Sequence, residues 1–502
     1  MIRKLLIANR GEIAVRIVHA CREMGIESIA VFSEADESAA HVEAADEAIA
    51  IGPPQAAESY LSIPKIIGAA KRTGADAVHP GYGFLSENAE FARACRDASL
   101  VFVGPPADVI ARMGSKIEAR RLMQEAGVPI VPGETPANQT DDGIKAAIGR
   151  VGLPVLIKAS AGGGGKGMRQ VDGAAEIDEA IQSARREATA AFGDGTLYVE
   201  RLVRNARHVE VQIFADEHGN VMHLFERECS TQRRHQKVIE ESPSPALTLA
   251  MRKKMTSAAV EAVRRTGYRN AGTIEFLLEG HGDTASFYFL EMNTRLQVEH
   301  PLTELVTGVD LVRAQILVAS GEPLPWKQED LSQRGHAIEC RIYAEDPAQG
   351  FLPQAGRLLC YREPRMPGVR IDAGVREGGE VSVYYDPMLA KLIAYGETRE
   401  AARARAIAAL REYPILGIRT NIAFLVQILA HERFIKAAVD TSFLDAEGGA
   451  LARAAAAVPD AAMAAAAACA TAGMHGSDAA GGILAAGEAA ADPWSQLQGW
   501  RG

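Results

Sequence analysis

About the first hundred residues alternate between short apolar runs and amphipathic segments, and this alternation restricts the fold more than any other feature. The apolar runs have the length of β-strands, and the segments between them show the periodicity of α-helices. Strands joined in this way form a parallel sheet with helices on both faces, an open doubly wound α/β arrangement. The expected strands cover 4–8, 28–33, 76–81 and 100–105, and the expected helices cover 12–25, 62–74 and 87–98.

Ligands of such sheets bind beyond the carboxyl ends of the strands, so glycines at those ends can indicate a cofactor. Gly81-Tyr82-Gly83 begins a GxGxxG fingerprint, but Ser86 stands where the third glycine belongs. The sequence therefore argues against a nicotinamide cofactor.

Beyond an expected helix at 115–128 the pattern of the chain changes twice. Two strand-like runs, 153–160 and 195–203, enclose a glycine-rich turn and a charged helix, which predicts a small separate unit. After about residue 205 the runs become longer and antiparallel in character, and they cover 208–216, 220–230, 272–280, 286–293, 337–346 and 390–397. The last fifty or so residues are rich in Ala and Gly, a composition typical of loose helix or linker.

Composition excludes several classes of function. Of 502 residues 47% are apolar and the mean hydropathy is −0.04, and the sequence holds no apolar run of about 18 residues that could cross a membrane. The formal net charge of −10 argues against general nucleic-acid affinity. The six cysteines form no CxxC pair, and the chain begins directly with a strand-like run. We therefore expect a cytoplasmic protein with no membrane or nucleic-acid partner and no signal peptide.

The stretch FYFLEMNTRLQVEHP, Phe287–Pro301, has a polar residue at every second position along most of its length. At a strand's period of two, Leu290 and Met292 begin an apolar face that could pack on a core. The opposite face carries an unbroken polar row: Glu291, Asn293, Arg295, Gln297 and Glu299.

The polar row can be placed in a hairpin with the strand-like run before it. A turn centred on Asp283 pairs Glu275 with Glu291 across the two strands. Two facing carboxylates repel each other. A divalent cation would remove the repulsion, with Glu275, Glu291 and the Asn293 amide as oxygen ligands for Mg²⁺ or Mn²⁺. The alternative is a solvated strand face on which water screens the two glutamates.

A glycine run, Gly162–Gly165, follows the strand-like LPVLIK and precedes Lys166 and Gly167. Its backbone N–H groups can close over phosphates, and Lys158 at the strand end can reach a phosphate as a point charge. The run is not a P-loop, because Gly167 stands where that pattern requires Ser or Thr. The combination predicts a mobile lid over a nucleotide, with a merely flexible turn as the alternative.

A short basic run, RRHQK at 233–237, lies between acidic residues. A solvated charge cluster and a nucleic-acid patch are alternatives, but the shortness of the run and its acidic flanks disfavour nucleic acid. We expect Lys237 and its neighbours to form an anion site for a small molecule together with Arg295. His300 and His336 are expected to be structural, because spacing implies no partner for either of them.

Nine stretches occur in one order from the first residue to about residue 445: IANRGEIAVR, HPGYGFLSENAEFA, ASAGGGGKGM, RHVEVQIFAD, ECSTQRRHQKVIEESP, GTIEFL, FLEMNTRLQVEHPLTE, GHAIECRIYAEDP and YYDPMLAKLI. Together they resemble the biotin carboxylase component of biotin-dependent carboxylases, a member of the ATP-grasp superfamily. The resemblance implies an α/β fold in which a doubly wound domain at 1–112 is followed by an ATP-grasp fold. The latter has a helical linker and lid at 113–203 and an antiparallel-sheet domain at 204–446, with a possible partner-docking tail at 447–502.

The resemblance also implies a reaction and its partners. ATP activates bicarbonate as carboxyphosphate, and biotin is then carboxylated at its ureido nitrogen, with Mg²⁺ or Mn²⁺ required. Biotin is expected on a separate biotin carboxyl carrier protein or domain, because no AMKM attachment motif is present in this sequence. Further implied partners are the carboxyltransferase subunit of an acyl-CoA carboxylase and a second copy of the chain or a larger complex. The ending PWSQLQGWR resembles the stretch that leads α-subunits of such carboxylases into their subunit-interaction and carrier domains.

The candidate site residues follow from the same resemblance. Those expected at the metal are Glu275, Glu291 and Asn293, and those around bicarbonate are Lys237, Arg295, Gln297, the backbone of Val298 and the general base Glu299. Those at biotin are Tyr82, Gly83 and Arg341, of which Arg341 stabilises the biotin enolate. Those at ATP are Lys116, Lys158, Gly164, Gly165, Glu200, Arg201, Leu202, His208, Gln232, His235, Glu275 and Glu291. Many relatives have Lys where Arg201 stands, which leaves that side-chain contact open.

Two other classes of function compete with this one. Another ATP-grasp ligase would activate a carboxylate as an acyl phosphate for an amine, but RLQVEHP and ECRIYAEDP are typical of biotin carboxylases. A non-catalytic nucleotide-binding scaffold would be favoured by loss of Glu275, Glu291, Lys237 or Arg295, and all four are present. The sequence therefore predicts an ATP-dependent ligase.

Overall fold

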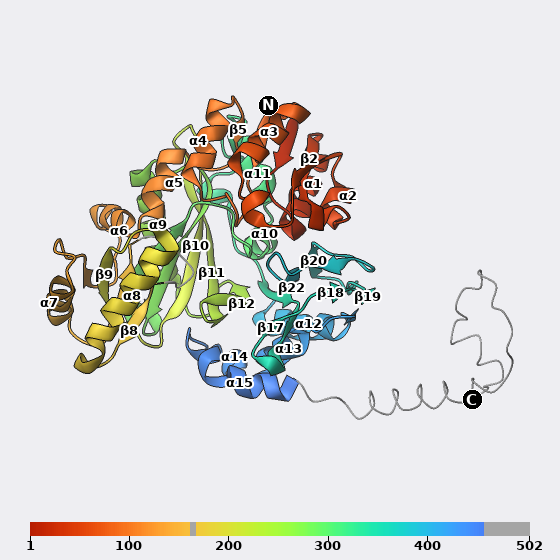
Figure 1. Cartoon of the computed structure of the whole chain (residues 1–502). Helices are drawn as coiled ribbons and strands as arrows, with labels where there is room; N and C mark the ends of the chain where they lie inside the picture. Colours follow the sequence, from red (N-terminus) through yellow and green to blue (C-terminus); the bar gives the residue numbers. More distant parts are fainter. Residues whose placement is uncertain (161–166, 456–502) are drawn as a thin grey trace, which may run out of the picture. The chain divides into compact units, whose positions relative to one another are not determined.

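The alternating N-terminal pattern folds into a parallel five-stranded sheet with the order β3-β2-β1-β4-β5. Figure 1 shows this part of the chain in red and orange. The structure is a computed structural model that describes residues 1–160 and 167–455. Every strand and helix expected in this region is present: β1 (Lys4–Ile7), α1 (Gly11–Met24), β2 (Glu27–Ser33), α3 (Ile63–Thr73), β4 (Ala77–His79), α4 (Ala89–Asp97) and β5 (Val101–Phe102). The pattern missed α2 (Ala40–Ala44), the half-exposed edge strand β3 (Glu47–Gly52) and α5 (Ala107–Gly114).

A small antiparallel sheet with the order β6-β9-β7-β8 forms the second unit. Its strands are β6 (Gly133–Glu134), β7 (Val155–Ala159), β8 (Arg169–Val171) and β9 (Leu197–Arg201), which confirms the two predicted runs. Helices α7 (Asp141–Val151) and α8 (Ile177–Phe192) pack on this sheet, and α6 (Lys116–Glu125) precedes it. The predicted lid glycines Gly164 and Gly165 lie between β7 and β8, outside the described residues.

The third unit is an antiparallel sheet of eight strands with the order β14-β13-β10-β11-β12-β15-β22-β20. The six predicted runs are β10 (Arg207–Ala215), β11 (Val221–Arg233), β13 (Asn270–Glu279), β14 (Ser286–Asn293), β15 (His336–Tyr343) and β22 (Met388–Gly396). The strands β12 (Gln236–Ser242) and β20 (Val369–Ala373) were not predicted. Every residue of β10 and β15 is buried, so the sheet is covered on both faces where these strands run.

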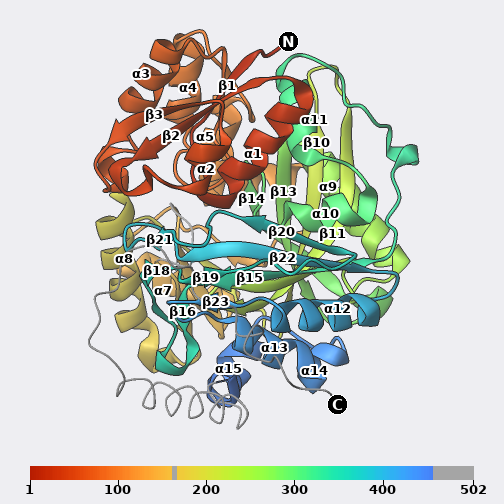
Figure 2. The same ribbon diagram turned by 90° about the vertical axis from the view of Figure 1, so that its right-hand side faces the viewer.

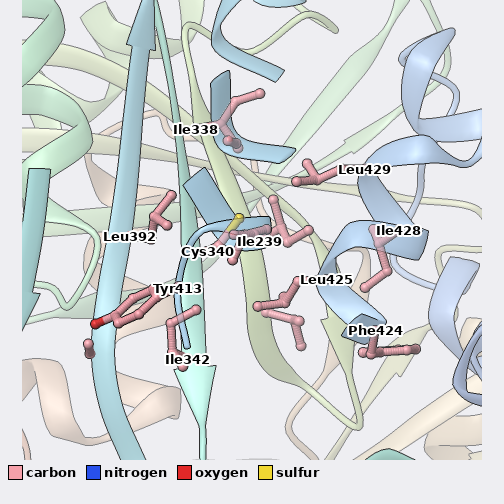
Figure 3. Packing of buried hydrophobic residues seen from close by; sticks show 14 of the residues in the cluster. Ile239, Ile338, Cys340, Ile342, Leu392, Tyr413, Phe424, Leu425, Ile428 and Leu429 are labelled. Carbon is pink, nitrogen blue, oxygen red and sulfur yellow. The ribbon is translucent and has the colours of Figure 1, made fainter. Parts of the chain in front are cut away.

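Alternation along β15 separates the core from the other face of the sheet. Ile338, Cys340 and Ile342 pack in a hydrophobic cluster with Leu392 of β22 and with residues of α13 (Ile422–Ala430) (Figure 3). The residues between them, Glu339 and Arg341, therefore lie on the opposite face. Figure 2 shows α12 (Arg399–Arg411), α13 and α14 (Glu432–Ile435) on one side of this part of the sheet and α1 on the other.

The remaining elements connect these units. They are α9 (Leu249–Thr266), α10 (His300–Thr307), α11 (Leu311–Ala319), α15 (Phe443–Ala455) and the short strands β16 (Glu345–Asp346), β17 (Leu352–Pro353), β18 (Gly356–Arg357), β19 (Cys360–Tyr361), β21 (Glu380–Val381) and β23 (Ile415–Leu416). The predicted tail lies outside the described residues from 456 onwards. Within the described ranges no helix combines the length and the apolar character needed to cross a membrane.

Candidate active site

The predicted hairpin is present, with one irregularity that the sequence did not reveal. Glu275 of β13 pairs with Glu291 of β14, as expected. The register then shifts by one residue, so that Phe276 pairs with Phe289 and Leu290 forms a β-bulge.

The bulge changes which positions of β14 face the core. Phe287 and Phe289 pack in a hydrophobic cluster before the bulge, and Met292 packs in the same cluster after it. The core-facing positions are therefore odd-numbered before Leu290 and even-numbered after it. The predicted apolar face is confirmed at Met292 and wrong at Leu290, which lies in the bulge and is only half-buried.

The polar row does not continue as a strand, which corrects the sequence prediction. β14 ends at Asn293, and residues 294–299 form an irregular segment, here called the 294–299 turn, before α10 begins at His300. Contacts from outside hold its backbone. The Thr294 N–H donates to a Glu87 carboxylate oxygen at 3.0 Å, and the Lys391 ammonium donates to the Val298 carbonyl at 2.8 Å.

One ammonium group joins the two parts of the row. Lys237 Nζ lies 2.6 Å from Glu210 Oε2, 2.9 Å from Glu275 Oε1 and 2.7 Å from Glu299 Oε1. Burial alone would lower the pKa of Lys237, but Cys229 and the three carboxylates raise it well above its ordinary value. The side chain therefore remains a cation at the centre of three buried anions.

Glu299 is held as an ionised acceptor. Besides Lys237, the Arg341 guanidinium contacts it at 3.0 Å and also donates to Glu240 at 2.6 Å. Burial would raise the pKa of Glu299, but Lys237, Arg341 and Arg227 outweigh it and lower the pKa well below its ordinary value. For Glu240 the balance is reversed, because burial raises its pKa to about 7 despite Arg341.

The facing glutamates have unequal surroundings. Burial would raise the pKa of Glu275, but Lys237 and His208, whose Nε2 lies 3.0 Å from Glu275 Oε2, lower it far below its ordinary value. Burial and the charge of Glu275 raise the pKa of Glu291. Within the described ranges no hydrogen bond or ion pair reaches the Glu291 carboxylate.

This donor set fits a hard divalent cation. Glu275, Glu291 and Asn293 offer oxygen ligands only, which suits Mg²⁺ or Mn²⁺, and a cation would relieve the repulsion that raises the pKa of Glu291. The Asn293 amide N–H donates to Glu275 at 2.9 Å, so its oxygen is directed away from that carboxylate and accepts from Arg295 at 3.0 Å. In the described chain, two groups of three side chains have ligand atoms close enough together to hold a metal ion: His208–Glu210–Glu275 and Glu210–Cys229–Glu299. Both groups include Glu210.

The nucleotide candidates are spread over the small sheet unit, the strands of the large sheet and the hairpin turn between β11 and β12. Lys158 of β7 lies 2.5 Å from Glu200 of β9, and Arg120 contacts the same carboxylate. The basic run forms the tight turn between β11 and β12, in which Arg234 and His235 both have positive φ, 49° and 66°. This two-residue connection is typical of β-hairpins.

The three residues expected to meet adenine form the end of β9 and the chain just after it. Their backbone is fixed in the lid: the Arg201 N–H donates to Pro132 O at 2.8 Å and the Leu202 N–H to Pro154 O at 3.0 Å. The Arg201 guanidinium turns to Glu279 at 2.9 and 2.8 Å and lies over the Tyr288 ring. The Arg201 side chain therefore contacts the β13–β14 hairpin of the large sheet.

The three biotin candidates line one cavity of about 470 Å³. Tyr82 and Gly83 reach it from the carboxyl end of β4, and Arg341 reaches it from β15. The bicarbonate candidates Arg295 and Val298 line the same cavity, so the two predicted subsites meet there.

Sequence reasoning assigned no role to several residues that the structure places in or around the site: Arg10, Glu12, Glu87, Glu210, Arg227, Glu240, Tyr385 and Lys391. The sequence held a signal for some of them. Glu210 follows His208 by two positions in a strand, which puts both side chains on one face. Arg10 and Glu12 follow β1, at the sheet edge where ligands bind.

Family models match nearly all of the described chain. The biotin carboxylase N-terminal domain matches residues 1–110 and the biotin carboxylase C-terminal domain matches residues 339–446. Between them, the ATP binding domain of the carbamoyl-phosphate synthase L chain matches residues 115–327. Biotin carboxylase 1 of Bacillus subtilis is 51% identical over 445 residues, which cover 89% of this chain and 98% of that protein. The chain belongs to the biotin carboxylase family. As a member, it is an ATP-dependent ligase that carboxylates biotin.

Solved structures of biotin carboxylases have the same fold. The biotin carboxylase domain dimer of the Hydrogenobacter thermophilus 2-oxoglutarate carboxylase, in complex with MgADP, ADP and bicarbonate, has a TM-score of 0.86 at 43% identity. That match covers 90% of this chain and 99% of that one. The Campylobacter jejuni biotin carboxylase–β-γ-ATP complex also has a TM-score of 0.86, at 44% identity, covering 89% and 99%. These matches confirm the predicted doubly wound domain followed by an ATP-grasp fold.

A second group of relatives is longer than this chain. The methylcrotonoyl-CoA carboxylase subunit alpha of Oryza sativa is 51% identical over 447 residues. The match covers 88% of this chain but 60% of that subunit. These relatives therefore contain a biotin carboxylase region within a larger protein.

Proposed function

We propose that the residues around Lys237 carry out both steps of biotin carboxylation. The observation that carries the proposal is the contact of one ammonium with Glu275 and Glu299, at 2.9 and 2.7 Å. It brings the candidate metal ligand and the candidate base within reach of one reacting centre. Arg295 and Gln297 lie beside them, joined at 2.9 Å, and complete an anion pocket.

In the first step, an oxygen of bicarbonate attacks the γ-phosphorus of ATP, the bond to ADP breaks, and Glu299 accepts the bicarbonate proton. Glu299 is a weak base while Lys237 and Arg341 both contact it. Anionic substrates in the pocket compete for those cations, which raises the proton affinity of Glu299 when it is needed. Mg²⁺ held by Glu275 and Glu291, with Asn293 beside them, would neutralise charge on the transferring phosphoryl group.

In the second step, the ureido nitrogen of biotin gives its proton to the departing phosphate and bonds to the carboxyl carbon of carboxyphosphate, whose bond to the phosphate oxygen breaks, so that inorganic phosphate is released. Arg341 lines the same cavity as Tyr82 and Val298, which supports the proposal that its charge stabilises the developing enolate. In this proposal the lid excludes water from the site, because carboxyphosphate exposed to water would hydrolyse. Lys116, Lys158, His208, Gln232, His235, Gly164 and Gly165 bind the nucleotide in this proposal.

The proposed partners follow from the names of the relatives. We propose that biotin is presented by a carrier protein or carrier domain and that a carboxyltransferase subunit passes the carboxyl group to an acyl-CoA. The support is the likeness to carboxylase α-subunits. A homodimer is proposed because a relative of 43% identity is a dimer of such domains.

The test is release of ADP by the purified chain with Mg²⁺, ATP, bicarbonate and free biotin, omitting each in turn. Turnover that requires all four is expected. ATP cleavage that ignores both biotin and bicarbonate would overturn the proposal and favour another ligase of the superfamily. Glu299→Gln should abolish turnover, and the matched control Glu400→Gln, whose carboxylate is 65% exposed in a surface pair, should not.

A further inference from the structure

A fully buried lysine lies directly behind the site. Lys391 of β22 has no exposed side-chain surface, and its ammonium donates to the Val298 carbonyl at 2.8 Å. It also lies 3.1 Å from Glu12 Oε1 and 3.7 Å from Asp372 Oδ2. A buried charge is costly unless it is paired and hydrogen-bonded, so these contacts account for the presence of this group in the interior.

The carboxylate of Glu12 extends the connection to the biotin cavity. Glu12 lies in the first turn of α1, is buried, and accepts a hydrogen bond from the Tyr82 hydroxyl on the same oxygen that Lys391 approaches. Its other oxygen has no partner among the described residues. The contacts therefore run in one line from the Val298 carbonyl through Lys391 and Glu12 to Tyr82.

We propose that Lys391 is a positioning residue that fixes the biotin wall at Tyr82 relative to the bicarbonate turn at Val298. The inference rests on the proposed function and names a residue to which that function assigned no role. Lys391 touches neither substrate; it acts through Glu12 on one side and through the backbone of the 294–299 turn on the other.

The charge state and the packing both suit this role. Burial would lower the pKa of Lys391, but Glu12, Asp372 and Glu339 raise it above its ordinary value, so the ammonium stays charged. Its neighbours on β22, Ala390 and Leu392, belong to the hydrophobic cluster on the other face of the sheet. They, and not Lys391, supply the apolar packing of that strand.

The three partners of Lys391 come from separate parts of the chain. Val298 lies in the turn after β14, Glu12 lies in the first turn of α1 in the N-terminal unit, and Asp372 lies on the edge strand β20. The Arg370 guanidinium donates two hydrogen bonds to the Asp372 carboxylate, at 2.7 and 2.8 Å. Lys391 therefore binds both the N-terminal unit and the 294–299 turn and holds them in position relative to each other.

The test compares Lys391→Met with the matched control Arg399→Met, which breaks a part-buried ion pair between the first residue of α12 and Glu241. Lys391→Met should raise KM for both bicarbonate and biotin about tenfold, the effect of losing one charge-assisted hydrogen bond. KM for ATP should change less than about twofold. Arg399→Met should lower thermal stability without moving any of the three KM values.

A double variant keeps the test decisive if Lys391→Met does not fold. Lys391→Met with Glu12→Gln removes both buried charges, which is milder than removing one. The amide oxygen that Glu12→Gln introduces can still accept from the Tyr82 hydroxyl, so KM for biotin should return toward the wild-type value while KM for bicarbonate stays raised. A folded variant of either kind with unchanged KM for bicarbonate would overturn the inference. Failure of the proposed function would instead appear in the wild-type protein, as ATP cleavage whose rate does not depend on bicarbonate or biotin.

Discussion

The polar row that begins at Glu291 has two halves whose support differs. Glu291 and Asn293 belong to β14 and are held by backbone pairing with β13, the strand just before it in the chain. Arg295, Gln297 and Glu299 lie in the 294–299 turn, which is held by side chains from distant parts of the chain. Those side chains are Glu87, Lys391 and Arg341.

The difference separates two ways of placing a functional group. In the strand half, backbone hydrogen bonds fix the geometry, so a side chain can change without moving its neighbours. In the turn half, the geometry depends on ion pairs that converge from other elements, so a change at a distance can displace the site. The predictions below test this contrast, from the largest expected effect to the smallest.

Among the changes compared below, Glu291→Gln should lower activity the most and stability the least. Removal of one carboxylate from the proposed metal site should lower kcat by about 10³-fold, because charge stabilisation of the phosphoryl group is lost. The melting temperature should not fall, since the facing charge of Glu275 is relieved. Titration of turnover with Mg²⁺ and thermal unfolding measure the two effects, and EDTA should abolish wild-type turnover. A large loss of stability would show that the strand half also depends on its side chains.

Glu87→Gln should disturb the turn half from a distance. Its carboxylate accepts from Thr294 N and from Arg295 Nε, both at 3.0 Å. Weakening these two hydrogen bonds should raise KM for bicarbonate about tenfold and leave KM for ATP unchanged. Steady-state kinetics decide the matter, with the exposed Asp97→Asn as the control. An unchanged KM for bicarbonate would contradict the view that Glu87 supports the turn.

The two halves should also differ in their response to pH. Burial raises the pKa of Glu240, which contacts Arg341 under the turn, from its ordinary 4.5 to about 7. The folded protein therefore binds more protons than the unfolded chain between these values, and stability falls as pH rises. The free energy of unfolding of the wild type relative to Glu240→Gln should fall by about 2 kcal/mol from pH 5 to pH 8.

Glu275 of β13, which pairs with Glu291 of the strand half, provides the comparison. Its pKa is lowered by Lys237 and His208 against the effect of burial, so it is ionised in the folded state throughout this range. The unfolded chain is also largely ionised above pH 5. The stability of the wild type relative to Glu275→Gln should therefore be nearly the same at pH 5 and pH 8. Urea unfolding at the two pH values measures both differences in the free energy of unfolding. An equal change between pH 5 and pH 8 for the two variants would contradict the predicted contrast.

Arg201→Lys should have the smallest effect. The guanidinium lies at the outer end of the hairpin, one-third exposed, and pairs with Glu279 rather than reaching into the site. A partly exposed pair contributes about 1 kcal/mol or less, and the backbone of β9 is unchanged. KM for ATP should change less than about twofold. A tenfold change would show that the side chain reaches the nucleotide after the lid moves.

Much of the site could be predicted because hairpin pairing is local. The facing of Glu275 and Glu291 followed from a turn position and a period of two, and the structure confirmed it. The bulge at Leu290 could not be predicted, because either face of that strand offers apolar residues to the core. The end of the strand at Asn293 was missed for a related reason. Polar and apolar residues continue to alternate in the sequence beyond Asn293, but the turn there is held by contacts with distant residues, which spacing in the sequence does not reveal.

The sequence by itself determined the α/β order of the N-terminal unit and the antiparallel strands of the large sheet, and it named the candidate residues of the site. These follow from periodicity, from short-range pairing and from a resemblance carried by long motifs. Only the tertiary structure decided that one ammonium, Lys237, joins three carboxylates, and that Lys391 and Glu12 link the turn to Tyr82. The physical reason is that buried charges take their partners from whichever elements the fold brings together, and those partners lie far apart in the chain.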